Sequence, residues 1–149
     1  MKIYFDTNVL VAAFQPDHMH HVPSFAALVR VQRGDQIGYV AGHGLVELYS
    51  VLTRAPFANR PGPDEVQDLI EESILACFQI IEVTTQSHLA AIATCASAGW
   101  RGGRIHDAVH IQAAAQAGCD LIYTYNLADF HTLAPTQAVQ IQNPPEPKL

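Results

Sequence analysis

The chain has little that would place it in a membrane or outside the cell. No stretch of its 149 residues approaches the ~20 consecutive apolar residues that a transmembrane helix needs. The N-terminal segment MKIYFDTNVLVAAF has one lysine and then an aspartate, Asp6, inside what would be the apolar region of a signal peptide. We therefore expect a cytoplasmic protein that does not associate with membranes.

Cysteine is also scarce. The three cysteines, Cys77, Cys95 and Cys119, are odd in number and far apart in the sequence. A disulfide framework needs paired cysteines, and a zinc ribbon needs closely spaced ones. We expect reduced and mostly buried thiols, and neither kind of scaffold.

Positively charged residues are few: the chain has eight lysines and arginines against fourteen acidic residues, which gives a net charge of −6. Surfaces that bind nucleic acid are usually basic, so this balance argues against a general nucleic-acid-binding protein. Five of the acids, however, lie in the run DEVQDLIEE at 64–72, which leaves nine acids against eight bases elsewhere. If some of those nine bind a divalent cation, the remaining surface is neutral or positive. The net charge therefore weakens the case for a nucleic-acid substrate without excluding one.

The apolar content of 49% and charged content of 15% are typical of one compact domain. The hydrophobic pattern alternates strands with helices along the chain. We predict strands at 2–6, 36–41, 78–84, 120–125 and 138–142, and helices at 7–14, 20–33, 44–54, 64–77, 86–98, 106–117 and 127–130. Most strands are apolar runs without clean alternation, as in buried parallel sheets. We expect a three-layer α/β/α sandwich over residues 1–142 with a mainly parallel central sheet, followed by a flexible tail at 143–149.

Acidic and amide side chains follow several of the predicted strands. Asp6 ends the first strand, and Glu47 lies in the first turns of the helix after the second. Asp107 opens a later helix, and Asn126 and Asp129 come directly after the fourth strand. Because ligand sites of open α/β sheets form at the carboxyl ends of the strands, these side chains could meet at one edge.

Several carboxylates in one cleft raise each other's pKa unless a cation keeps them ionised. Hard oxygen ligands without cysteine favour magnesium or manganese over zinc. Such a cluster suits metal-assisted attack of water on a phosphodiester, with one or two ions.

Each acid also has a structural interpretation. Asp6 and Asp107 could each serve simply as a helix cap, and Asp129 could be an ordinary turn residue. Glu47 could lie on a solvated helix face, paired with Arg54. The metal-site prediction therefore depends on the combination.

Four motifs resemble those of PIN-domain nucleases in order and spacing. They are FDTNVL at 5–10, VELYSVL at 46–52, IHDAVHIQAAAQAG at 105–118 and IYTYNLADF at 122–130. Together they cover nearly the whole chain, and they look closest to the VapC-type toxins of bacterial type II toxin–antitoxin systems. The resemblance implies metal-dependent endonucleolytic cleavage of RNA. It also implies a homodimer and a small antitoxin that blocks the active site.

The resemblance implies specific metal ligands. Asp6, Glu47 and Asp107 would be the first three acids of a catalytic Mg²⁺ or Mn²⁺ site. Family members place the fourth acid where either Asn126 or Asp129 stands here. Because the first of these is an amide, Asp129 is the expected ligand, and Asn126 would orient water or accept a hydrogen bond.

Other residues of the motifs would support the site. Thr7 and Asn8 would shape it around the first acid, and Thr124 would supply a hydroxyl behind the ligands. We expect Arg101 and Arg104, in the GWRGGR loop, to meet substrate phosphate or the antitoxin; the alternative is a solvated loop.

Competing interpretations remain. His106 and His110 share a helix face as in zinc hydrolases, but HDAVH lacks the glutamate of His-Glu-x-x-His. We instead expect His110 beside the acidic site. A haloacid-dehalogenase-type phosphatase would need an aspartate at Asn8. A silent PIN-like binding module would have little need for all three acids, and a housekeeping PIN ribonuclease would have no antitoxin.

Overall fold

A computed structural model describes residues 1–134 and 139–148. Its centre is a sheet of five parallel strands in the order β3-β2-β1-β4-β5. The strands are β1 (Lys2–Phe5), β2 (Ile37–Ala41), β3 (Gln79–Ile81), β4 (Leu121–Tyr123) and β5 (Gln140–Gln142). The helices are α1 (Thr7–Phe14), α2 (His21–Gln32), α3 (Gly42–Arg54), α4 (Pro63–Leu69), the π-helix η1 (Ile70–Leu75), α5 (Thr85–Ala98), α6 (Arg104–Gln116) and α7 (Leu127–Leu133).

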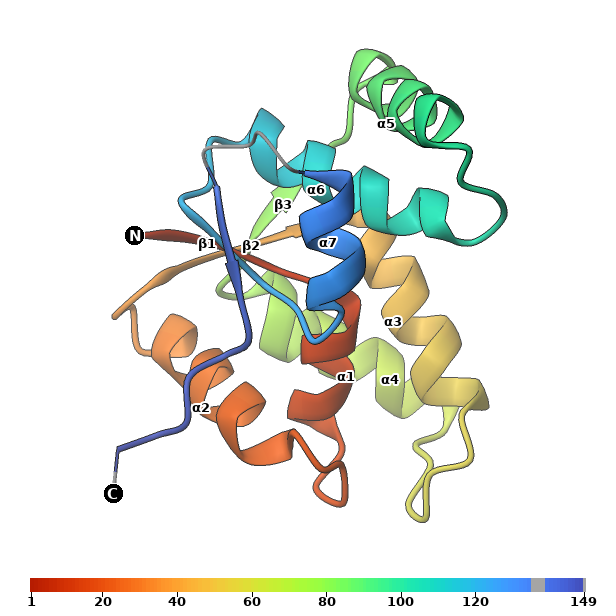
Figure 1. The fold of residues 1–149 in the computed structure, drawn as a ribbon. Helices are drawn as coiled ribbons and strands as arrows, with labels where there is room; N and C mark the ends of the chain where they lie inside the picture. Colours follow the sequence, from red (N-terminus) through yellow and green to blue (C-terminus); the bar gives the residue numbers. More distant parts are fainter. Residues whose placement is uncertain (135–138, 149) are drawn as a thin grey trace.

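Helices cover both faces of the sheet (Figure 1). One face packs against α1 to α4 and η1, and the other against α5, α6 and α7, with a separate apolar cluster on each side. The predicted three-layer α/β/α sandwich with a parallel sheet is confirmed.

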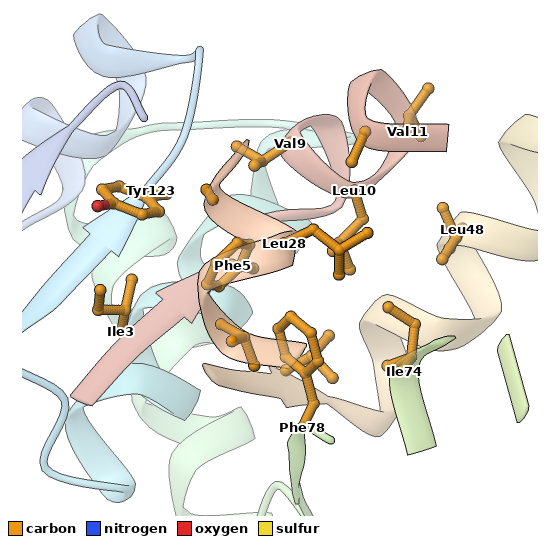
Figure 2. Close-up of a cluster of buried hydrophobic side chains, with 14 of the residues drawn as sticks. Ile3, Phe5, Val9, Leu10, Val11, Leu28, Leu48, Ile74, Phe78 and Tyr123 are labelled. Atoms are coloured by element: carbon orange, nitrogen blue, oxygen red, sulfur yellow. The ribbon is translucent and has the colours of Figure 1, made fainter. Parts of the chain in front are cut away.

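The central strand β1 contributes to both cores because its side chains alternate between the two faces. Ile3 and Phe5 belong to the cluster under α1, α2 and α3, whereas Tyr4 belongs to the cluster under α6. The Phe5 ring meets Phe78 and Tyr123 edge-on, at centroid distances of 5.0 and 5.4 Å (Figure 2). The strand is therefore fixed from both sides, which holds the residue after it, Asp6, in place.

The strand order reverses at β1. The chain moves outward from β1 to β2 and β3, then returns through α5 and α6 to β4 on the other side of β1. In doubly wound folds, such a reversal leaves a crevice at the carboxyl ends of the two strands beside it. Asp6 follows β1 and Thr124 follows β4, so both lie at this crevice.

The structure differs from the predicted elements in detail. The predicted helix 64–77 is α4 followed by the π-helix η1, and the predicted strand 78–84 shortens to Gln79–Ile81. The end of the chain from 143 to 148 has no helix or strand, yet Pro144 in it is buried. Its flexibility stays a prediction. Among the described residues, no helix has the length and apolar character to span a bilayer.

Candidate active site

Asp6 is the innermost acid of the site, with only 4% of its surface exposed. It is the N-cap of α1. Its Oδ1 accepts a hydrogen bond from the Thr7 backbone N–H at 2.7 Å, and its Oδ2 accepts one from the Thr124 hydroxyl at 2.7 Å. Asp6 therefore does cap α1, and the bond from Thr124, directly after β4, fixes the same carboxylate from the other side.

Three of the predicted acids line one pocket of about 250 Å³. Asp6 enters it from the end of β1, Glu47 from the second turn of α3, and Asp107 from the first turn of α6. Thr7, Asn8, Val11, His18 and Val51 complete the wall. The sheet edge therefore brings together side chains that are about 100 residues apart in the sequence, as predicted.

Asn126 connects Asp107 with Asp129. The Asn126 side-chain amide donates to Asp107 Oδ2 at 2.7 Å and to Asp129 Oδ2 at 3.0 Å. Asp129 lies on α7 and reaches the cluster through this amide, whereas Asp107 lines the pocket directly. Asn126 thus acts here as a donor between two carboxylates.

Asn8 and Thr124 tie α1 to the segment after β4. Asn8 accepts from the Tyr125 backbone N–H at 3.2 Å and donates to the Thr124 hydroxyl at 3.4 Å. Thr124 also accepts from the Asn126 backbone N–H at 3.0 Å. Both residues hold the loop that carries Asn126.

A buried histidine holds Glu47. His110 on α6 is 1% exposed, and its Nε2 lies 2.7 Å from Glu47 Oε1 and 3.7 Å from Asp6 Oδ1. Its Nδ1 meets the Tyr4 hydroxyl at 2.5 Å. The prediction that His110 lies beside the acidic site is confirmed. Glu47 forms ion pairs with His43 and His110. Among the described residues it forms none with Arg54, the alternative partner that the sequence offered.

Burial and neighbouring charges shift the pKa values of the side chains in this site. Burial raises the pKa of Asp6, although His110 and the hydrogen bond from Thr124 oppose it. Burial and the charge of Asp6 raise the pKa of Asp107 to about 6. For Glu47, the hydrogen bond and charge of His110 outweigh burial and lower the pKa. Burial alone would lower the pKa of His110, but its acidic neighbours raise it.

The donor set fits a hard divalent cation. Two carboxylates with raised pKa values face one pocket, and the Thr7 hydroxyl oxygen in the same wall is buried without a hydrogen-bond partner among the described residues. Buried polar atoms normally have partners, so this one indicates room for a water or ligand. Asp6, Glu47 and Asp107 would hold Mg²⁺ or Mn²⁺, with all ligands being oxygen atoms.

Removing one of the crowded charges should stabilise the metal-free protein. Because the folded state raises the Asp107 pKa to about 6, its contribution to stability is complete below the unfolded value of 3.8 and is lost as pH rises through about 6. Asp107→Asn should therefore melt a few degrees above wild type at pH 7.5 in a chelator, and this gap should narrow at pH 5. Thermal melts at both pH values test this.

The matched control is Asp68→Asn, the same change on the exposed surface of α4. It should show no such pH-dependent gap. An Asp107→Asn protein that melts below wild type at pH 7.5 would contradict the reading of Asp107 as a destabilising charge.

The two loop arginines differ in their surroundings. Arg101 is exposed in the loop before α6. Arg104, the first residue of α6, places its guanidinium carbon 3.9 Å from the centroid of the Trp100 ring, a cation–π contact. Trp100 itself packs partly buried against the α6 side of the core.

Sequence reasoning missed three contributors. His18, from the segment between α1 and α2, lines the pocket. Tyr4 meets His110 from within β1, and His43 contacts Glu47 at 3.0 Å. The spacing of four between His43 and Glu47 was a usable signal for the last contact, whereas only burial reveals the Tyr4 contact.

Comparisons with known proteins agree with this architecture. The PIN domain family model matches residues 3–134. The Mycobacterium tuberculosis toxin VapC20, which cleaves the sarcin-ricin loop, is 18% identical, with a TM-score of 0.68 over 93% of this chain and 98% of that chain. VapBC2 from Rickettsia felis, bound to a DNA fragment from its promoter, is 14% identical, with a TM-score of 0.66 over 96% and 98%.

A third similar structure is FitAcB from Neisseria gonorrhoeae, which is 19% identical, with a TM-score of 0.64 over 95% of this chain and 97% of that chain. No curated protein sequence matches significantly. At these identities the similar structures show the fold, and the family model establishes membership. The chain belongs to the PIN domain family.

Proposed function

We propose that the protein is a metal-dependent endoribonuclease and the toxin of a VapBC-type toxin–antitoxin pair. The observation that carries this is the convergence of Asp6, Glu47 and Asp107 on one pocket, with raised pKa values for two of them. Membership of the PIN family supports nuclease activity in general, and the similarity to VapC20, VapBC2 and FitAcB supports the toxin assignment.

The residues would divide the work between binding and orientation. Asp6, Glu47, Asp107 and Asp129 would be the catalytic acids and metal ligands. Bound Mg²⁺ or Mn²⁺ would lower the pKa of water and stabilise the charge that develops on the phosphodiester. Asn126 would orient the attacking water from its place between two carboxylates, and the Thr124 hydroxyl keeps Asp6 aimed into the pocket.

Thr7 and Asn8 shape the pocket wall, and Arg101 and Arg104 would contact the RNA backbone or an antitoxin from the loop before α6. Exposed apolar side chains on α2 and α3, namely Val22, Phe25, Val46 and Tyr49, support a homodimer or a bound antitoxin. The setting would be the cytoplasm, where such a pair acts.

Removal of divalent metal tests this function. Purified protein should cleave a structured, end-labelled RNA with Mg²⁺ or Mn²⁺, and a chelator should abolish cleavage until metal is restored. Glu47→Gln, prepared in parallel, should be inactive, whereas Glu72→Gln, the same change at an exposed position of η1, should cleave like wild type.

Cleavage that resists chelation, or that persists in Glu47→Gln, would contradict the proposal. An absence of cleavage on every RNA, with no metal bound, would favour a silent binding module. The toxin assignment has its own test, because a short reading frame for a DNA-binding partner should adjoin the gene. Without one, a housekeeping PIN ribonuclease is the better assignment.

A further inference from the structure

A second group of metal-ligating atoms shares Glu47 with the acidic pocket. His43 in the first turn of α3 and His106 in the first turn of α6 face each other, with Nε2 of the first 2.9 Å from Nδ1 of the second. His43 Nε2 also lies 3.0 Å from Glu47 Oε1. One ligand atom from each of the three residues lies within 4.8 Å of the other two.

An imidazole nitrogen atom offers its lone pair to a metal when the ring carries its proton on the other nitrogen atom. A neutral imidazole carries one N–H, so His43 Nε2 cannot fully satisfy both Glu47 Oε1 and the lone pair of His106 Nδ1. The same Oε1 also faces His110 Nε2 at 2.7 Å. The rings of His43 and His106 lie nearly parallel, at an interplanar angle of 10°. A cation between the three ligand atoms would bind the lone pairs that the protons leave free.

The spacing suits a tetrahedral ion. Zinc bonds of about 2.0–2.2 Å place neighbouring ligand atoms roughly 3.4 Å apart. Two of the three observed separations, 2.9 and 3.0 Å, are shorter than this by about half an ångström, and the third lies within 4.8 Å. A pocket of about 200 Å³, lined by His43, Glu82 and His88 among others, adjoins the group and leaves access for solvent as a further ligand.

We propose that His43, Glu47 and His106 form a second metal site, selective for Zn²⁺ or a similar transition ion. Two imidazoles and one carboxylate form a ligand set that zinc enzymes use, whereas the oxygen-lined acidic pocket suits Mg²⁺. The site is distinct from a pairing of His106 with His110, because His110 turns inward to Tyr4 and Glu47. Metal binding at this second site does not depend on whether the protein cleaves RNA.

Calorimetric titration of tag-free, metal-free protein with Zn²⁺ tests the site, with Co²⁺ absorption as a second readout. Wild type should bind one Zn²⁺ per chain and give the visible bands of four-coordinate Co²⁺. His43→Asn and His106→Asn should each weaken this binding by about tenfold or more. His131→Asn, an exposed histidine on α7, should bind like wild type. Circular dichroism confirms that each variant folds.

Two further variants separate this site from its rivals. Asp6→Asn should keep Zn²⁺ binding even where it loses RNA cleavage, so the failure of the proposed function would not remove this site. Loss of Zn²⁺ in Asp6→Asn but not in His43→Asn would place the ion in the acidic pocket and overturn the proposal. Loss that follows His18→Asn instead would place the ion in the segment 17–21, with the same consequence. Wild-type protein that binds no Zn²⁺ would also overturn it.

Discussion

Asp6→Asn should lower metal-dependent RNA cleavage by about a thousandfold or more, because the metal it would help to bind contributes several kcal/mol to the reaction. The amide removes the negative charge at the deepest point of the pocket. It also changes the hydrogen bonding, since Thr7 N–H and the Thr124 hydroxyl both donate to the present carboxylate. The measurement is the initial rate of cleavage of an end-labelled RNA with saturating Mg²⁺.

The matched control is Asp68→Asn, which makes the same chemical change on exposed α4 and should cleave at the wild-type rate. Circular dichroism and a thermal melt should show Asp6→Asn folded, because the amide oxygen can still cap α1 at the Thr7 N–H. A folded Asp6→Asn that cleaves within tenfold of wild type would refute a catalytic role for this residue.

His110→Leu should destabilise the fold by about 2–4 kcal/mol, although leucine fills a similar volume. The substitution leaves the Tyr4 hydroxyl, buried in β1, and Glu47 Oε1 without their partner on α6. It also removes the group that lowers the Glu47 pKa and holds that side chain. Cleavage should therefore fall as well, at a temperature where the variant is still folded. Urea unfolding at pH 7.5 gives the stability difference.

Tyr4→Phe separates the hydroxyl from the ring. Alone it should cost about 1 kcal/mol for the lost hydrogen bond. In the His110→Leu background it should cost less, because the partner on α6 is already gone and only the 3.4 Å hydrogen bond from the Ala41 backbone N–H remains. Additive effects of the two substitutions, or a loss below about 1 kcal/mol for His110→Leu, would mean that the Tyr4–His110–Glu47 contacts contribute little to stability.

The fold was predictable because its signals are local. Apolar runs such as Ile3 to Phe5, separated by helical spacing and turn glycines, indicate buried parallel strands without any knowledge of long-range contacts. The π-helix η1 was not predictable, since its sequence at 70–75 keeps the spacing of an ordinary helix. The strand predicted at 78–84 shortened because residues beyond Ile81 find no partner strand in the described sheet.

The site was predictable as far as strand ends determine it. Asp6, Glu47 and Asp107 converge because β1 ends, and α3 and α6 begin, at one edge of the sheet. The contacts of His110 did not follow in detail, because it meets Glu47 on α3 and Tyr4 on β1, and spacing within one helix does not encode contacts between elements. Asn126 and Asp129, the two positions where the family places its fourth acid, are hydrogen-bonded to each other at 3.0 Å.

The buried carboxylates of the site lower the stability of the metal-free protein. Asp6 and Asp107 both lie where burial raises their pKa values, so the metal-free protein carries charges that destabilise it at neutral pH. A bound cation would reverse that effect. Sites that bind charged ligands commonly sacrifice stability in this way.

The most direct test of the account is a crystal structure with Mn²⁺, whose anomalous scattering locates the ion. We predict a peak in the pocket between the carboxylates of Asp6 and Asp107, with oxygen ligands about 2.0–2.3 Å away. The peak should be absent from Asp6→Asn crystals treated in the same way. A wild-type map at saturating Mn²⁺ that has no peak at these carboxylates would contradict the claim that the acids of this site hold a divalent cation.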